Sequence, residues 1–183
     1  ERISLANYGG ADPTGATVSD DAVLAAMTAG LDKFANEVSY WYDGLGQPYD
    51  VNYTGVDRRT IEIHVPAGHW KVTDKIFSRL SHPRAPFVGF VFRGEGGESS
   101  VFELQTGGVE SWFYKNDNGA TESNFQRLTF YNIGFRSDNY QFGNLVNMYS
   151  EGGPKQLGFY FCHFWNLQKC LETRGPGNAD LNV

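Results

Sequence analysis

Cysteine and histidine are the residue types most often used for metal binding or nucleophilic chemistry, and three of them fall within residues 162–170. Cys162 and Cys170 stand inside apolar runs, and His163 directly follows Cys162. Zinc sites need paired ligands at close and regular spacing, which this segment does not have. Neighbours in a strand also point to opposite faces, so Cys162 and His163 would not act together. We interpret both cysteines as small core residues and predict no metal site and no cofactor.

Two aspartates and one glycine-rich segment are the next candidates for chemistry. Asp12 precedes Pro13 in a turn, and Asp20 falls in the first turn of a predicted helix. Backbone hydrogen bonding alone explains aspartate at both kinds of position. Residues 94–97, Gly-Glu-Gly-Gly, follow a strand but open no helix and lack the lysine of a phosphate-binding loop. We expect no catalytic role for any of these residues.

A dense group of aromatic residues lies in residues 38–59, which show no regular period. The group consists of Tyr40, Trp41, Tyr42, Tyr49 and Tyr53. Long irregular segments are uncommon in compact domains and are often functional. Two interpretations stay open: the rings bind a ligand, or they pack the insertion onto its own domain.

One amphipathic helix is predicted near the start of the chain, from Asp20 to about Ala35. Ser19 can cap it, and Asp20 and Asp21 place negative charge in its first turn. Its apolar stripe consists of Val23, Met27, Leu31 and Phe34. We expect this stripe to cover one end of a larger β structure.

Strand patterns dominate the chain after residue 60. Ile61, Ile63 and Val65 alternate with polar residues, and residues 66–68 then form a turn. Further apolar runs occupy residues 70–76, 87–92 and 101–104. The links between the runs are too short for crossover helices, and parallel strands cannot be joined by two-residue hairpins. A coiled path of the chain resolves this conflict.

A weak internal repeat supports a coiled path. Residues 128–135 resemble residues 158–165, and three pairs of residues that are 31 positions apart match. The matched pairs are Phe130 with Phe161, Asn132 with His163, and Ile133 with Phe164. Such a repeat is typical of solenoids and propellers, and the blade signatures of propellers do not occur in the sequence. We therefore predict a solenoid.

Composition narrows the function classes. The 183 residues are 40% hydrophobic and include 22 glycines, which favours a single domain of strands and tight turns. The net charge of −6 argues against nucleic-acid binding, which usually requires a basic surface. No run of about 20 apolar residues is present, so we predict no membrane insertion.

Three segments together resemble a known family. They are residues 3–15, Ile-Ser-Leu-Ala-Asn-Tyr-Gly-Gly-Ala-Asp-Pro-Thr-Gly, then residues 19–21, Ser-Asp-Asp, and then residues 61–70, Ile-Glu-Ile-His-Val-Pro-Ala-Gly-His-Trp. In order and spacing they resemble the opening of the pectate-lyase superfamily. Two departures stand out: Ala-Asp-Pro-Thr-Gly replaces the family's Gly-Asp-Gly turn, and Trp70 stands where the family usually has tyrosine.

The resemblance implies an all-β fold, a right-handed single-stranded parallel β-helix with an N-terminal capping α-helix. Residues 1–183 would form the N-terminal part of one such domain, which is expected to continue beyond Val183. The helix cap would span about residues 19–36, the aromatic insertion about residues 38–59, and the coils about residues 60–183.

The resemblance also implies a function. We expect a phage tailspike or tail-fibre component in the virion tail, a homotrimer that contacts other virion tail proteins and binds and depolymerises host cell-surface polysaccharide. Tyr40, Trp41 and Tyr42 are the predicted carbohydrate-binding residues, because aromatic faces stack on sugar rings. The alternatives are a secreted pectinase-like or glucanase-like enzyme, and a structural virion β-helix without glycan activity.

The sequence assigns no catalytic residue to this activity. A hydrolase needs two carboxylates roughly 5 to 9.5 Å apart, whereas a lyase needs a base and often Ca²⁺ or an arginine to neutralise the uronate. Possible carboxylates are Glu62, Glu103, Asp138, Glu151 and Glu172. The resemblance places the catalytic residues beyond Val183.

Overall fold

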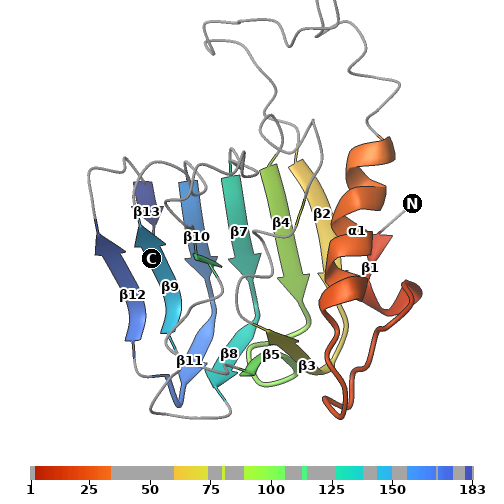
Figure 1. Cartoon of the computed structure of the whole chain (residues 1–183), viewed down its shortest axis with the longest axis horizontal. Helices are drawn as coiled ribbons and strands as arrows, with labels where there is room; N and C mark the ends of the chain where they lie inside the picture. Colours follow the sequence, from red (N-terminus) through yellow and green to blue (C-terminus); the bar gives the residue numbers. More distant parts are fainter. Residues whose placement is uncertain are drawn as a thin grey trace, which may run out of the picture.

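The computed structural model describes residues 3–33, 60–73, 80, 89–105, 113–114, 127–137, 144–149, 156–167, 169–174 and 180–182. Within these ranges the chain forms mostly strands in parallel sheets, together with one α-helix (Figure 1). None of the helical structure described there has the length and hydrophobicity needed to cross a membrane. The predicted aromatic insertion, with Tyr40, Trp41 and Tyr42, lies outside the described residues.

The described strands form three sheets. The first sheet contains, in this order, β1 (Ile3–Ser4), β2 (Thr60–Val65), β4 (Gly89–Gly94), β7 (Arg127–Tyr131), β10 (Gln156–Tyr160) and β13 (Asp180–Asn182). The second sheet contains β3 (Gly68–Thr73), β5 (Ser100–Gln105), β8 (Gly134–Ser137) and β11 (His163–Trp165). The third sheet contains β6 (Phe113–Tyr114), β9 (Asn144–Tyr149) and β12 (Lys169–Arg174).

The chain visits the three sheets in a constant order, and we call one passage through them a circuit. The strands β4, β5 and β6 form one circuit, β7, β8 and β9 the next, and β10, β11 and β12 the one after. Each of these strands pairs in parallel with its counterpart in the neighbouring circuit. The predicted parallel arrangement of the strands is therefore confirmed for the described residues.

The structure confirms a repeat between the segments around Phe130 and Phe161 but corrects its offset. Phe130 pairs with Phe159, and Gly134 pairs with His163, so equivalent residues are 29 positions apart and the predicted separation of 31 was wrong. Phe161 occupies the position of Asn132, in the turn between the first and second sheets. Both residues have left-handed backbone conformations, with φ of 54° and 53°. This turn points the ring of Phe161 outward, whereas the predicted offset placed it with the buried Phe130.

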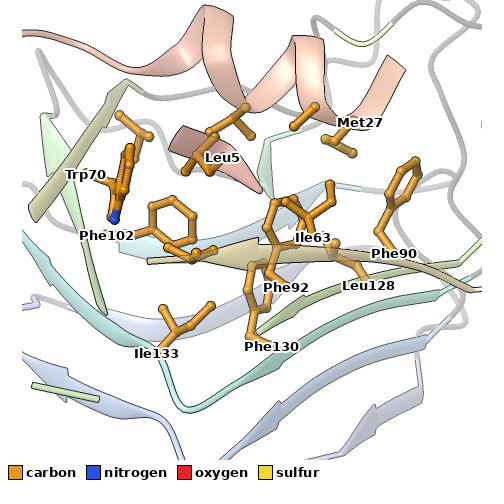
Figure 2. Packing of buried hydrophobic residues seen from close by; sticks show 14 of the residues in the cluster. Leu5, Met27, Ile63, Trp70, Phe90, Phe92, Phe102, Leu128, Phe130 and Ile133 are labelled. Atoms are coloured by element: carbon orange, nitrogen blue, oxygen red, sulfur yellow. The ribbon is translucent and has the colours of Figure 1, made fainter. Parts of the chain in front are cut away.

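Phenylalanine rings from successive circuits stack inside the molecule. Ring centroids of Phe92 and Phe130 lie 5.3 Å apart, and those of Phe130 and Phe159 lie 5.4 Å apart, in nearly parallel planes. A second row, from the second sheet, consists of Phe102, Phe135 and Phe164. Figure 2 shows side chains from the helix and the sheets directed toward this common interior. Burial of each ring contributes about 1.5–3 kcal/mol, so these rows are a main source of stability.

The helix α1 (Asp20–Lys33) lies against the first strands, β1 and β2, at one end of the first sheet (Figure 1). Of the predicted apolar stripe, Val23, Met27 and Leu31 are buried, whereas Phe34 lies outside the described residues. The helix packs closely, because a side chain at Gly30 would overlap Ile61 of β2. The 3-10 turn η1 (Leu5–Asn7) also contributes a fully buried residue, Leu5. The end of the sheet structure is thus covered by α1.

The segment from Pro13 to Asp20 protects the edge of β3, the first strand of the second sheet. His69 N donates to Pro13 O at 2.7 Å, and Ser19 N donates to Lys71 O at 2.7 Å. Thr73 N donates to Asp20 Oδ1 at 2.8 Å, and the hydroxyl of Thr73 also contacts Asp20. These bonds link α1 to β3 through the buried Asp20. They also cover the edge of β3, and unpaired strand edges are otherwise templates for aggregation.

Asp12 is held by hydrogen bonds within its own turn, and residues 94–97 open no helix, as predicted. The Asp12 carboxylate accepts hydrogen bonds from Thr14 N at 2.9 Å and Thr17 N at 2.7 Å, and from both threonine hydroxyls. These bonds, led by the one from the Thr14 hydroxyl, hold the Asp12 pKa well below its usual range. Residues 94–97 lead into β5 and not into a helix.

Candidate functional site

Outward-facing side chains on the first sheet are paired with one another. Glu62 of β2 accepts a bond from Arg93 Nε of β4 at 3.1 Å. The guanidinium of Arg93 lies 4.7 Å from the ring centroid of Tyr131, and that ring stacks on Tyr160 at 4.7 Å. These outward side chains of the first sheet therefore use many of their polar and aromatic groups in contacts with one another.

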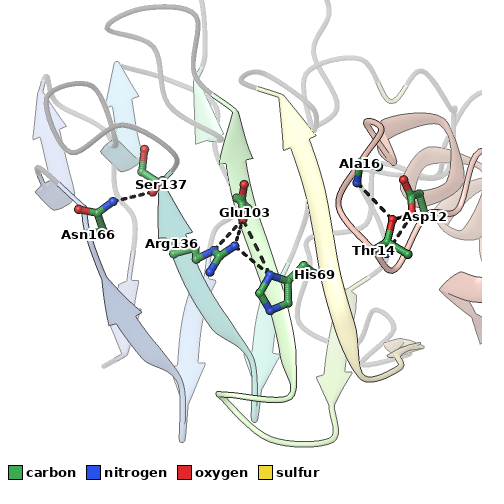
Figure 3. A network of polar contacts seen from close by, with 8 residues as sticks. All are labelled: Asp12, Thr14, Ala16, His69, Glu103, Arg136, Ser137 and Asn166. Atoms are coloured by element: carbon green, nitrogen blue, oxygen red, sulfur yellow. Dashed lines mark hydrogen bonds and ion pairs between the residues drawn. The ribbon is translucent and has the colours of Figure 1, made fainter.

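A polar cluster on the second sheet differs from these side chains of the first sheet, because some of its hydrogen-bonding atoms are still available. It consists of His69 of β3, Glu103 of β5 and Arg136 of β8, which point toward one another across three neighbouring strands (Figure 3). Arg136 Nε donates to Glu103 Oε2 at 2.7 Å, and Arg136 Nη2 contacts the same oxygen. Arg136 Nη2 also lies 2.8 Å from His69 Nδ1. One guanidinium therefore joins a carboxylate and an imidazole.

The geometry of this cluster fixes the roles of its atoms. A guanidinium has no acceptor, so the contact of Arg136 Nη2 with His69 Nδ1 is a hydrogen bond when Nδ1 is the acceptor nitrogen of the imidazole. The side chains of Glu103, Arg136 and His69 are 14%, 33% and 43% exposed, so the cluster is open on one side. Among the described residues, Glu103 Oε1 and Arg136 Nη1 have no hydrogen-bond partner. The cluster can still accept and donate hydrogen bonds.

Two exposed rings lie beside the cluster on β11. Trp165 pairs in register with Arg136 and is 36% exposed, although indoles are usually highly buried. His163 lies two residues before Trp165, and their ring centroids are 6.4 Å apart. Cys162 and Phe164, which alternate with them, are partly buried. The strand period therefore turns His163 and Trp165 outward and Cys162 inward, as the sequence predicted for Cys162 and His163.

Glycines make room for these two rings. A side chain at Gly134 would overlap the indole of Trp165, and a side chain at Gly97 would overlap the imidazole of His163. The indole of Trp165 therefore lies back over Gly134 in the preceding circuit, and the imidazole of His163 lies over Gly97 in the circuit before that. Rings held in this way have lost conformational freedom before any ligand binds, which lowers the entropic cost of binding.

The arrangement presents an aromatic face beside groups that donate and accept hydrogen bonds. A flat indole face can stack on the apolar face of a pyranose ring, while the adjacent carboxylate, guanidinium and imidazole can bind hydroxyl groups. We refer to His69, Glu103, Arg136, His163 and Trp165 as the second-sheet site.

Cys162 has no part in this site. The thiol of Cys162 lies 3.5 Å from Phe130 O and packs against the core, as predicted. Burial raises the pKa of the Cys162 thiol, which keeps it protonated. Cys170 falls in β12, where its side chain is outside the described residues.

The predicted carboxylates do not come together in the described part of the chain. Glu62 lies on the first sheet and Glu103 on the second, and each is paired with an arginine of a neighbouring strand. Glu172 belongs to β12, where side chains are outside the described residues, as are Asp138 and Glu151 altogether. Glu62 and Glu103 are therefore on different sheets, and each is engaged by an arginine.

Sequence reasoning found Glu103 as a candidate but missed His69, Arg136 and Trp165. The internal repeat contained the necessary signal, because an offset of 29 places Arg136 directly beside Trp165. The offset of 31 instead aligned Asn132 with His163, and this separated the residues of the site.

Comparison of the chain with protein-family models, with curated proteins and with solved structures gives no match.

Proposed function

We propose that this chain is part of a right-handed parallel β-helix protein of the phage tailspike type, which binds polysaccharide of the host cell surface. The constant order of sheets in each circuit and the parallel pairing between circuits support a β-helix. Right-handedness is supported by the strong general preference of parallel crossover connections for that hand. The sequence motifs at residues 3–15, 19–21 and 61–70 support the family.

Polysaccharide is the ligand that best fits the second-sheet site. The observation that carries this proposal is the exposed indole of Trp165, held over Gly134 beside the cluster of Arg136, Glu103 and His69. An acidic chain with a net charge of −6 is a poor binder of nucleic acid, whereas neutral sugar rings need aromatic faces and mixed polar groups.

Binding to an immobilised panel of purified bacterial lipopolysaccharides and capsular polysaccharides tests the proposal. We expect the protein to bind at least one member of the panel. The Trp165→Ala variant should bind that polysaccharide at least about tenfold more weakly, since an indole contact is lost. Tyr131→Ala, which removes a ring from the first sheet, is the matched control and should bind normally.

Two results would contradict the proposal. Absence of binding to every polysaccharide would favour the purely structural β-helix. Full binding by Trp165→Ala would show that the second-sheet site is not the binding site.

Depolymerisation is followed in the same samples by new reducing ends and by absorbance of unsaturated uronate. Reducing ends without absorbance identify a hydrolase, and absorbance identifies a lyase. The proposed homotrimer is tested by light scattering, where a monomer would favour a secreted enzyme.

A further inference from the structure

Phe161 combines two unfavourable features. Its side chain is 81% exposed, and its backbone lies in the left-handed region with φ of 54°. A bulky residue in this conformation is a genuine outlier, because its Cβ crowds the following carbonyl oxygen. The described residues leave this ring almost uncovered.

The preceding circuit shows what the turn itself needs. The equivalent residue there is Asn132, with φ of 53°, and Asn166, with φ of 56°, follows β11. Asparagine is the residue other than glycine that adopts this conformation most readily. An asparagine at position 161 would serve the turn better than phenylalanine, so the ring has another purpose. Strained residues of this kind are concentrated at functional sites.

Phe161 lies two residues before His163, in the turn that leads into β11. Phe161, His163 and Trp165 are all exposed, while the residues between them are partly buried. Side chains two residues apart along a strand are separated by about 6.6 Å, and the centroids of His163 and Trp165 are 6.4 Å apart. We call these three side chains the ring row.

We propose that Phe161 is a further carbohydrate-contacting residue, which extends the second-sheet site along the ring row to the corner between the second and first sheets. This inference rests on the proposed polysaccharide binding. A sugar chain would run along β11 and stay within one circuit. Successive sugar rings would stack on Trp165 and on Phe161.

A polysaccharide fits the ring row better than a second protein does. Cores of protein interfaces are contiguous apolar areas depleted of charge. Here the rings are separate, and the neighbouring side chains include Arg136, Glu103 and the exposed Glu98, which lies 4.0 Å from His163. Alternation of single rings and polar groups matches the alternation of apolar faces and hydroxyls on a sugar chain.

The test uses the variants Phe161→Asn and Phe161→Tyr and the best-bound polysaccharide of the panel. Phe161→Asn should bind that polysaccharide about tenfold more weakly. Its Tm should nevertheless rise by about 2 °C or more, because asparagine suits the turn. Phe161→Tyr keeps an aromatic face and should bind within about twofold of the original protein. Weaker binding by a more stable variant cannot be attributed to misfolding.

The other outcomes separate this inference from the proposed function. If Trp165→Ala loses binding while Phe161→Asn binds normally, the inference is wrong and the proposed function stands. If the original protein binds no polysaccharide, both are wrong. If Phe161→Asn changes the oligomeric state seen by light scattering and leaves affinity unchanged, the ring is a protein contact and the inference is overturned.

Discussion

The inward and outward side chains of the second sheet follow different rules. Inward, one row is aromatic in every circuit, with Trp70, Phe102, Phe135 and Phe164 in register. Outward, the corresponding row changes from Glu103 to Arg136 to Trp165. Packing constrains the inward row, because each ring must stack on the next. The outward row has no such constraint, and its variation is where binding chemistry can be specified.

The largest expected effect comes from breaking the inward row. Phe130→Ala should destabilise the protein by about 3–5 kcal/mol, because it removes a fully buried ring that stacks on rings of both neighbouring circuits. Denaturant unfolding measures the loss. Phe161→Ala removes the same side chain from an exposed position and should change stability by less than about 0.5 kcal/mol. Equal losses for the two variants would contradict the assignment of inside and outside.

Removal of the link between α1 and β3 should have the next largest effect. Asp20→Ala leaves Thr73 N without this partner in a part-buried position, at an expected cost of about 3 kcal/mol. Thr73→Ala, which keeps the backbone donor and the carboxylate, is the matched control and should cost less. Circular dichroism during thermal unfolding measures both variants. An unchanged Tm for Asp20→Ala would show that the helix does not depend on this link.

A single methyl group on the outward face tests whether the rings are held in place. Gly134→Ala should destabilise the protein by about 1–3 kcal/mol, because its Cβ would overlap Trp165 and the backbone of Gly97. Tryptophan fluorescence should also change as the indole of Trp165 is displaced. Gly9→Ala, where a Cβ meets nothing within 4 Å, is the control. Equal stability of both variants would mean that Trp165 is not packed over Gly134.

The ion pair of Glu103 and Arg136 should matter less for stability. Both side chains are partly exposed, so a double-mutant cycle of Glu103→Gln and Arg136→Gln should give a coupling of about 1 kcal/mol or less. Urea unfolding of the four proteins provides the measurement. A coupling of several kcal/mol would mean that this cluster is chiefly structural, and the case for a binding role would weaken.

Acid should affect the Asp12 turn in a defined direction. The folded-state pKa of Asp12 is lowered, so its contribution to stability is present above the unfolded pKa of about 3.9 and is lost as the pH falls toward the folded value. The difference in Tm between the original protein and Asp12→Asn should therefore be largest near pH 7 and shrink below about pH 4. A difference that grows on acidification would contradict the assigned hydrogen bonds.

The sequence predicted the inward side of the fold better than the outward side. Alternation at Ile61, Ile63 and Val65 and the stripe of Val23, Met27 and Leu31 both identified buried faces, because burial imposes a period on the sequence. The repeat was recognised with its offset wrong by two residues, since Phe130 and Phe161 are the same residue type in opposite environments. Only backbone conformation distinguishes them, as Phe161 lies in a left-handed turn.

The candidate site was less accessible to sequence reasoning. His69, Glu103, Arg136 and Trp165 lie on different strands and come together only when the register between circuits is known. No local pattern links them, because outward positions carry no hydrophobic period. The sequence alone likewise does not show that Gly134 and Gly97 make room for rings, because those rings come from another strand.

Parallel measurement of Tm and of polysaccharide affinity for Trp165→Ala shows whether the outward face of the second sheet binds polysaccharide. We expect Tm to stay within about 2 °C of the original value, because the ring is on the outward side of the sheet, while the Kd for the bound polysaccharide rises about tenfold or more. An unchanged Kd would contradict the claim that the outward face of the second sheet carries the binding function.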